Sequence, residues 1–107
     1  MKAAEAVPAG RITVSPEVIG DFCRRHHARK LSLFGSVLRD DFRPESDVDV
    51  LVEFEPAHVP GFIRMAAMEN ELSVLLGRKV DLLTLNSISH YFRERVLREA
   101  CLLHDAA

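Results

Sequence analysis

The clearest pattern along the chain is the alternation of apolar and polar residues over positions 47–54, DVDVLVEF. One side of a strand with this sequence carries Val48, Val50, Val52 and Phe54, and the other carries Asp47, Asp49, Leu51 and Glu53. Successive side chains of a strand point to opposite faces of its sheet. The pattern therefore predicts a half-buried strand whose open side displays the carboxylates of Asp47 and Asp49.

Helical and strand patterns flank this segment on both sides. Ser15 followed by Pro16 is typical of a helix start, and apolar residues recur at helical spacing from there to about His27. Gly77 stands where a second helix would end. The further elements that the pattern predicts are strands over 31–34 and 79–85, one helical turn over 37–41, and helices over 62–76 and from Ser87 to about Leu103.

This order of elements predicts the α/β (α+β) class, with a small mixed three-stranded sheet and helices packed on one face. A length of 107 residues fits one domain. We expect residues 1–14, which are rich in alanine and broken by Pro8 and Gly10, to be weakly ordered. Residues 15–107 are expected to form the single folded domain.

Composition and charge narrow the possible partners and locations. Hydrophobic residues make up 48% of the chain, charged residues 28%, and the formal net charge is −2. Domains that bind nucleic acid by themselves are usually basic, so the charge argues against DNA or RNA as the main partner. The sequence has neither a signal peptide nor a membrane-spanning stretch, which predicts a cytoplasmic protein.

The cysteines and histidines do not suggest a metal site. Cys23 and Cys101 are far apart and lie among apolar positions, so we expect them to be small buried hydrophobic residues. The five histidines have no metal-ligand spacing, and surface or helix-capping roles are expected for them.

Three aspartates share one phase in the predicted sheet. Asp81 lies between Val80 and Leu82, which point to the core, so it points to the same open face as Asp47 and Asp49. Three converging carboxylates make a site for hard cations and phosphates. An Asp-x-Asp pair alone is often only a solvated turn.

The preceding strand adds a second signal. Gly35 and Ser36 directly follow it, where a glycine lets a ligand approach the backbone and the free amides of the next turn can bind phosphate. A phosphate cradle and an acidic site are thus predicted at the same edge of the sheet.

At this point a resemblance to a known family is visible. The string Gly35-Ser36, ten residues, then Asp47-Val48-Asp49 resembles the signature of the DNA polymerase beta-like nucleotidyltransferase superfamily. The wider segment LSLFGSVLRDDFRPESDVDVLVEFEP resembles its smallest branch, the minimal nucleotidyltransferases or MNT proteins. The resemblance extends from about Val18 to Leu103 and implies the nucleotidyltransferase fold.

The resemblance implies roles for the aspartates and for the glycine-serine pair. Asp47 and Asp49 would coordinate one or two Mg²⁺ ions, and Asp81 would be either a further metal ligand or the base that accepts the proton of the attacking hydroxyl. Gly35 and Ser36 would hold the triphosphate of the nucleotide.

The resemblance gives Arg39 and Ser46 smaller parts in nucleotide binding. Arg39 would lie near the phosphates or orient the loop that carries Ser46; the alternative is a surface ion pair with Asp40 or Asp41. Many family members have a small residue in place of Leu38 and a glycine in place of Asp40, so the Arg39 loop departs from the family pattern here.

MNT proteins are similar to antitoxins that pair with a HEPN-family ribonuclease toxin and transfer AMP from ATP to a tyrosine of that toxin. The resemblance therefore implies a HEPN-type partner protein and a nucleoside triphosphate. Two alternatives stay open: an antitoxin that masks its partner by binding alone, and a small-molecule enzyme like those that inactivate aminoglycosides. The latter usually carry an additional helical domain, for which 107 residues leave no room.

Overall fold

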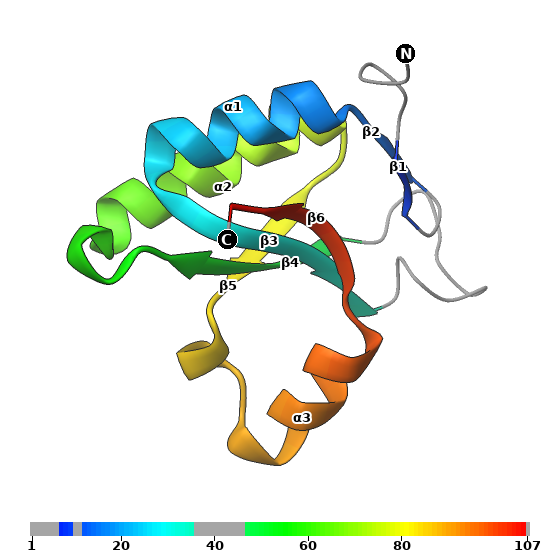
Figure 1. Ribbon diagram of the computed structural model, residues 1–107, viewed down its shortest axis with the longest axis vertical. Helices are drawn as coiled ribbons and strands as arrows, with labels where there is room; N and C mark the ends of the chain where they lie inside the picture. Colours follow the sequence, from blue (N-terminus) through cyan, green and yellow to red (C-terminus); the bar gives the residue numbers. More distant parts are fainter. Residues whose placement is uncertain (1–6, 10–11, 36–46, 107) are drawn as a thin grey trace.

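A computed structural model describes residues 7–9, 12–35 and 47–106 as a mixed α/β fold (Figure 1). Its main sheet has four strands in the order β5-β4-β3-β6, in which β4 and β5 are parallel and the other neighbours are antiparallel. The strands are β1 (Val7–Ala9), β2 (Ile12–Val14), β3 (Ala28–Phe34), β4 (Val48–Phe54), β5 (Val80–Leu83) and β6 (Cys101–Asp105). The helices are α1 (Pro16–His26), α2 (Phe62–Leu76) and α3 (His90–Glu99), with short 3-10 turns η2 (Pro56–His58) and η3 (Leu85–Ser87).

The hydrophobic core lies between the sheet and the pair α1 and α2, which cover one face of the sheet side by side (Figure 1). Val48, Val50 and Val52 are all buried, as predicted for one face of this strand, but Leu51 on the other face is buried as well. Phe22 of α1 and Met68 of α2 pack against the same cluster. The α/β class and the packing of helices on the apolar face of this strand are therefore confirmed.

The ends of α1 and α2 follow from local chemistry. The Ser15 side chain accepts a hydrogen bond from the backbone N–H of Val18 at 3.5 Å, and Pro16 is the first helical residue. His27 ends α1 in the left-handed conformation, with φ of 57°. Gly77 ends α2 in the same way, with φ of 68°, as predicted.

The prediction of one long last helix from Ser87 to about Leu103 is wrong at both ends. Ser87 lies in the turn η3, where its hydroxyl donates to the Thr84 carbonyl at 2.8 Å, and α3 begins only at His90. Ala100 is extended, and the chain continues as β6. β6 pairs with the edge of β3 that β4 leaves free, which gives the backbone N–H and C=O groups of both strands hydrogen-bond partners and buries Leu103. These tertiary contacts override the helical spacing of apolar residues in this part of the sequence.

The sheet consequently has four strands, not the three predicted. Near the N-terminus, β1 and β2 pair as an antiparallel hairpin from Val7↔Val14 to Ala9↔Ile12, and the weak order expected for residues 1–14 stays a prediction. Figure 1 shows α3 on the other side of the sheet from α1 and α2. None of the α3 side chains is buried.

None of the helices in the described residues combines the length and the apolar composition that crossing a lipid bilayer requires. Cys23 is buried in the core, and burial raises the pKa of its thiol to about 12. This confirms the prediction that Cys23 is a small buried hydrophobic residue, because a thiol with such a pKa is not reactive.

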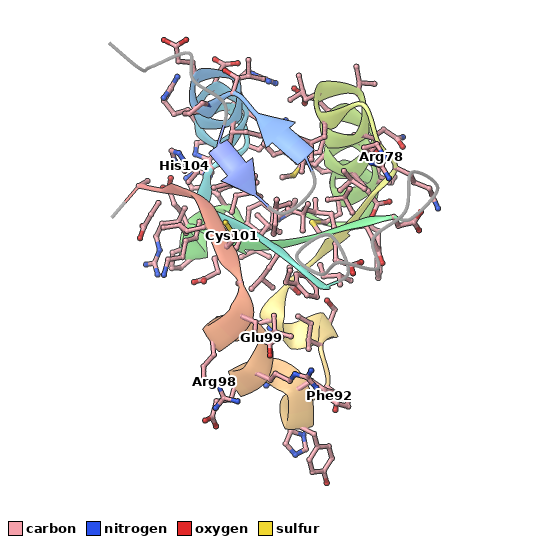
Figure 2. The ribbon with its side chains drawn as sticks, turned by 90° about the vertical axis from the view of Figure 1, so that its right-hand side faces the viewer. Arg78, Phe92, Arg98, Glu99, Cys101 and His104 are labelled. Carbon is pink, nitrogen blue, oxygen red and sulfur yellow. The ribbon has the colours of Figure 1, made fainter. Side chains whose placement is uncertain are left out.

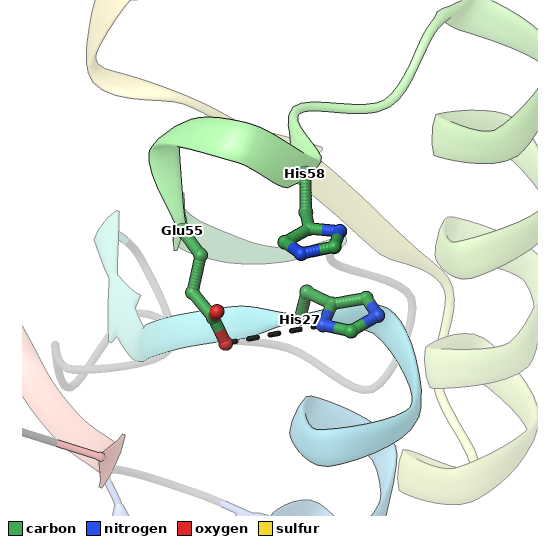
Figure 3. A group of neighbouring side chains, drawn as sticks. All are labelled: His27, Glu55 and His58. Atoms are coloured by element: carbon green, nitrogen blue, oxygen red, sulfur yellow. Dashed lines mark ion pairs between the residues drawn. The ribbon is translucent and has the colours of Figure 1, made fainter.

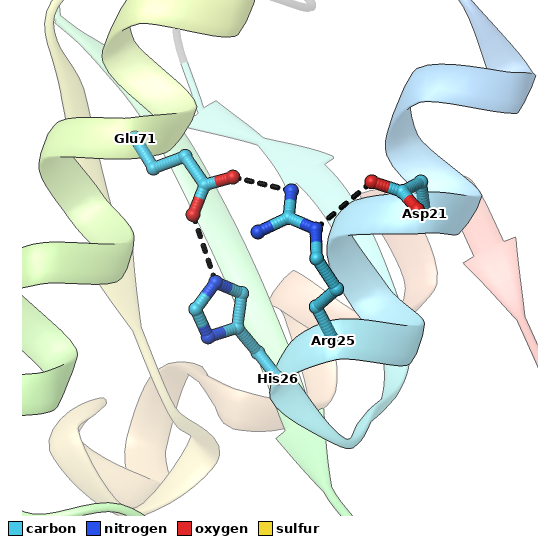
Figure 4. Close-up of polar contacts among 4 residues, drawn as sticks. All are labelled: Asp21, Arg25, His26 and Glu71. Atoms are coloured by element: carbon cyan, nitrogen blue, oxygen red, sulfur yellow. Dashed lines mark hydrogen bonds and ion pairs between the residues drawn. The ribbon is translucent and has the colours of Figure 1, made fainter.

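An ion-pair network joins α1 to α2 above the core (Figure 4). Glu71 of α2 accepts hydrogen bonds from the Arg25 guanidinium and from Nε2 of His26, the latter at 2.8 Å. Arg25 also donates to Asp21 at 2.9 Å, one turn earlier on α1. The hydrogen bond from Arg25 is the main reason why the pKa of Glu71 lies below its usual value of 4.5, and His26 lowers it further.

The lowered pKa predicts acid-dependent stability. Because Glu71 is harder to protonate in the folded state, its carboxylate stabilises the fold above pH 4.5, and this contribution is lost as the pH falls through the folded pKa. We expect Glu71→Gln to lower the free energy of unfolding at pH 7, and we expect its difference from wild type to shrink as the pH falls below 4.5, measured by denaturant unfolding. Glu99→Gln, which breaks an exposed pair with Arg95, is the control and should change little. A Glu71→Gln deficit that stays constant with pH would contradict this explanation.

Candidate functional site

Asp49 and Asp81 are direct neighbours across the parallel strands β4 and β5. The register pairs Asp49 with Asp81, between the pairs Val48↔Val80 and Val50↔Leu82. The valines and Leu82 are buried in the core, so both aspartates point to the opposite face of the sheet. Neighbouring strands lie about 4.8 Å apart, which brings the two carboxylates within reach of one ion.

Gly35 fits directly against the Asp49 carboxylate. The register places Phe34, the last residue of β3, beside Asp49, so that Gly35 leaves the strand next to this side chain. A Cβ atom on Gly35 would lie 2.4 Å from Oδ2 of Asp49, and the φ of 80° is one that residues with side chains rarely adopt. Glycine is therefore required here both by backbone conformation and by space.

Asp47 directly precedes β4, at the same edge of the sheet. The backbone N–H of Val48 donates to the carbonyl of Lys79 at 2.8 Å, which aligns the beginnings of β4 and β5. The exposed Asp47 carboxylate lies 3.7 Å from Nζ of Lys79. Lys79 was not predicted as a site residue, although its position two residues before Asp81 was a signal that could have indicated it.

The strand register places Asp49 beside Asp81, whereas Asp47 precedes β4 and its carboxylate lies against Lys79. Among the described residues, the group of side chains whose ligand atoms all lie within 4.8 Å of one another is not the aspartates but His27, Glu55 and His58. Two carboxylates about 5 Å apart repel by on the order of 3 kcal/mol at an effective dielectric of 20. Without a cation, attraction of Asp47 to Lys79 is favoured over convergence of the three acids.

The donor set fits a hard divalent cation. All three side chains offer carboxylate oxygens, the ligands that Mg²⁺ prefers, and Asp47 and Asp81 are exposed. Gly35 has no side chain, and its backbone therefore lies directly against the Asp49 carboxylate. Ser36, Arg39 and Ser46, the other predicted nucleotide-binding residues, lie outside the described residues.

Residues 15–103 match the family described as a nucleotidyltransferase domain. The chain belongs to this family. The protein adenylyltransferase MntA of Thermococcus cleftensis is 37% identical over 75 residues, which cover 70% of this chain and 74% of that protein. These matches confirm the resemblance to nucleotidyltransferases, and to their minimal branch, that the sequence motif indicated.

Solved structures agree with this assignment. A protein assigned as a minimal nucleotidyltransferase has a TM-score of 0.66 and 38% sequence identity, and the match covers 79% of this chain and 85% of that chain. The complex of a tri-AMPylated Shewanella oneidensis HEPN toxin with an MNT antitoxin contains a chain with a TM-score of 0.61 and 24% identity, covering 84% and 69% respectively. At that identity, the second likeness shows the fold alone.

Gly35 and Gly77, the glycines with positive φ in the described part of the chain, allow a matched test of the Gly35 contact. Gly77 has a φ of 68° and nothing within 4 Å of its added Cβ, so Gly77→Ala measures backbone strain alone, about 1–2 kcal/mol. Gly35→Ala adds the clash with Asp49, which moving the carboxylate relieves. We expect similar losses of stability in both variants, but loss of nucleotidyl transfer only in Gly35→Ala. Equal activity of the two variants would show that the position of Asp49 does not matter.

Proposed function

We propose that this nucleotidyltransferase transfers AMP from ATP to a tyrosine hydroxyl of a HEPN-type partner protein, with Asp47, Asp49 and Asp81 holding Mg²⁺. The observation that carries the proposal is the pairing of Asp49 with Asp81 on the open face of the sheet, with Gly35 against the Asp49 carboxylate. Nucleotidyl transfer depends mainly on positioning the phosphates and on charge stabilisation by metal ions, and carboxylates such as these can hold the ions.

AMP transfer needs only two reactants, ATP and the acceptor hydroxyl. The acceptor oxygen attacks the α-phosphorus, a new O–P bond forms, and the bond to the β-phosphate oxygen breaks so that pyrophosphate leaves. The hydroxyl proton passes to a carboxylate of the site, for which Asp81 is exposed. Mg²⁺, when bound, would neutralise the charge that develops on the phosphate oxygens.

The remaining residues have supporting roles in this proposal. The backbone of Gly35 and the side chain of Ser36 would hold the triphosphate, and Arg39 and Ser46 would contact the nucleotide. Lys79 forms an ion pair with Asp47. When the nucleotide binds, the Lys79 ammonium would release the Asp47 carboxylate and pair with a phosphate oxygen instead. Orienting the substrates in this way accounts for most of the catalytic effect in phosphoryl transfer.

The shape of the described residues favours a macromolecular acceptor over a small molecule. Small-molecule sites usually enclose most of their ligand. The cavities of about 520 and 240 Å³ in the described part of the chain are lined by other residues, and none of the three aspartates contributes to either. A partner protein could supply the wall that excludes water from the aspartates.

α3 offers a surface to which such a partner could bind. It extends from the open side of the sheet, and Figure 2 shows Phe92 and Arg98 far from α1 and α2. Tyr91 is 81% exposed and Phe92 57%, although aromatic residues of this size are usually covered. Exposed aromatic side chains of this kind are enriched in protein interfaces.

The names of the similar proteins support the same partner class. The relative in Thermococcus cleftensis is named a protein adenylyltransferase. The solved Shewanella oneidensis complex contains a toxin that carries AMP groups together with an MNT antitoxin. The cytoplasmic location stays a prediction.

Loss of one aspartate should remove activity and leave the fold intact. Replacing Asp49 by asparagine withdraws a charge from the site, and we expect transfer to fall by at least about 100-fold, or about 3 kcal/mol of transition-state stabilisation. The free energy of unfolding without metal should stay level or rise, since repulsion from Asp81 is relieved. Glu53→Gln is the control on the same face of β4 and should keep full activity. If Glu53→Gln lost as much activity as Asp49→Asn, the assignment of the site would be wrong.

The acceptor is tested by incubating the protein with ATP, Mg²⁺ and the protein encoded by the neighbouring gene, followed by intact-mass spectrometry. We expect the partner to gain whole AMP units, and Asp49→Asn to abolish the gain. Tight binding without a change of mass would instead favour an antitoxin that only masks its partner. AMP transfer to an aminoglycoside would favour the small-molecule enzyme.

A further inference from the structure

Three side chains with metal-binding atoms converge where α1 ends and β4 ends (Figure 3). His27 follows α1, whereas Glu55 and His58 follow β4, and one ligand atom from each lies within 4.8 Å of the others. Oε2 of Glu55 is 3.9 Å from Nδ1 of His27. The two imidazole rings are stacked, with centroids 3.8 Å apart and planes inclined by 9°.

The backbone holds these three residues together independently of their side chains. The N–H of Glu55 donates to the His27 carbonyl at 3.0 Å, and the register pairs Ala28 with Phe54 immediately beside it. The N–H of His58 donates to the Glu55 carbonyl at 2.8 Å, which closes the turn η2. The left-handed conformation of His27 directs the chain from α1 into β3 at this point. The positions of the three Cα atoms are therefore fixed by the fold.

Two imidazole nitrogens and one carboxylate oxygen are the donors that borderline divalent ions prefer, whereas Mg²⁺ selects oxygen alone. We propose that His27, Glu55 and His58 bind a divalent transition-metal ion such as Zn²⁺, with water in the open coordination position. This site is separate from the aspartates. Asp49 and Glu55 are six residues apart on an extended chain, which corresponds to about 20 Å.

Metal binding requires a small closure of the cluster. Zinc bonds of about 2.0–2.1 Å in a tetrahedral site put neighbouring ligand atoms about 3.4 Å apart, so separations that now reach at most 4.8 Å must shrink by up to about 1.4 Å. Glu55 and His58 are exposed and can move without disturbing the core. Rotation of the His58 ring out of the stack turns its nitrogen toward the ion, and the ion replaces the ring contact.

Binding at this position would connect two parts of the chain. His27 belongs to the α1–β3 junction, and Glu55 and His58 belong to the connection from β4 to α2. An ion would link these segments at the end of the sheet opposite the aspartates, and it would stabilise the folded state because the unfolded chain does not hold the three ligands together. The proposal is independent of the nucleotide-transfer function.

The site is tested by calorimetric titration of the metal-free protein with Zn²⁺ in the presence of excess Mg²⁺. We expect one Zn²⁺ per chain and a rise in Tm on binding. His58→Gln and His27→Asn, the latter chosen because asparagine tolerates positive φ, should each weaken binding by at least about tenfold. His90→Gln, Cys101→Ser and Asp49→Asn are controls that should bind Zn²⁺ like wild type. Circular dichroism confirms that each variant is folded.

Each other outcome decides against the proposal. Binding that is lost in Asp49→Asn would place the ion at the aspartates, and binding that is lost in Cys101→Ser would place it at that thiol. Undiminished binding in both His27→Asn and His58→Gln, or no Zn²⁺ binding by the wild-type protein, would overturn the site. As a second readout, addition of paramagnetic Ni²⁺ should broaden the ring NMR signals of His27 and His58 and spare those of His90.

Discussion

The parallel register of β4 with β5 is the constraint on which both the core and the site depend. One register places Val48 beside Val80 and Val50 beside Leu82 on the side of α1 and α2, and it places Asp49 beside Asp81 on the other side. A slip of one residue would expose the valines and bury the acids. Burial of the apolar residues thus holds two repelling carboxylates next to each other, which is the arrangement that a cation site needs.

The helices determine which face remains available to substrates. α1 and α2 cover the apolar face and are joined above it by Glu71, Arg25 and His26. α3 lies on the other side of the sheet, and none of its side chains is buried. The fold therefore combines a layer of sheet and helices with an end of the sheet at which Asp47 and Asp81 are exposed.

Patterns that are local in sequence predicted the parts of the fold that depend on local chemistry. The apolar face of β4 and the ends of α1 and α2 are predicted correctly, because each depends on residues within one short segment of sequence. The shared phase of Asp49 and Asp81 followed from their buried neighbours. The strand β6 could not be predicted in this way, since its conformation is decided by the free edge of β3, which is far away in sequence. For the same reason the spacing of His27 and His58 gave no sign that strand pairing brings them together.

The central claim is that the paired aspartates and Gly35 form the place where the nucleotide reacts. A crystal structure of the protein with Mg²⁺ and a non-hydrolysable ATP analogue tests it most directly. We expect metal density between the carboxylates of Asp49 and Asp81, with the phosphates of the nucleotide running past the backbone of Gly35. Nucleotide and metal bound elsewhere on the chain, with Asp49 and Asp81 contacting neither, would contradict it.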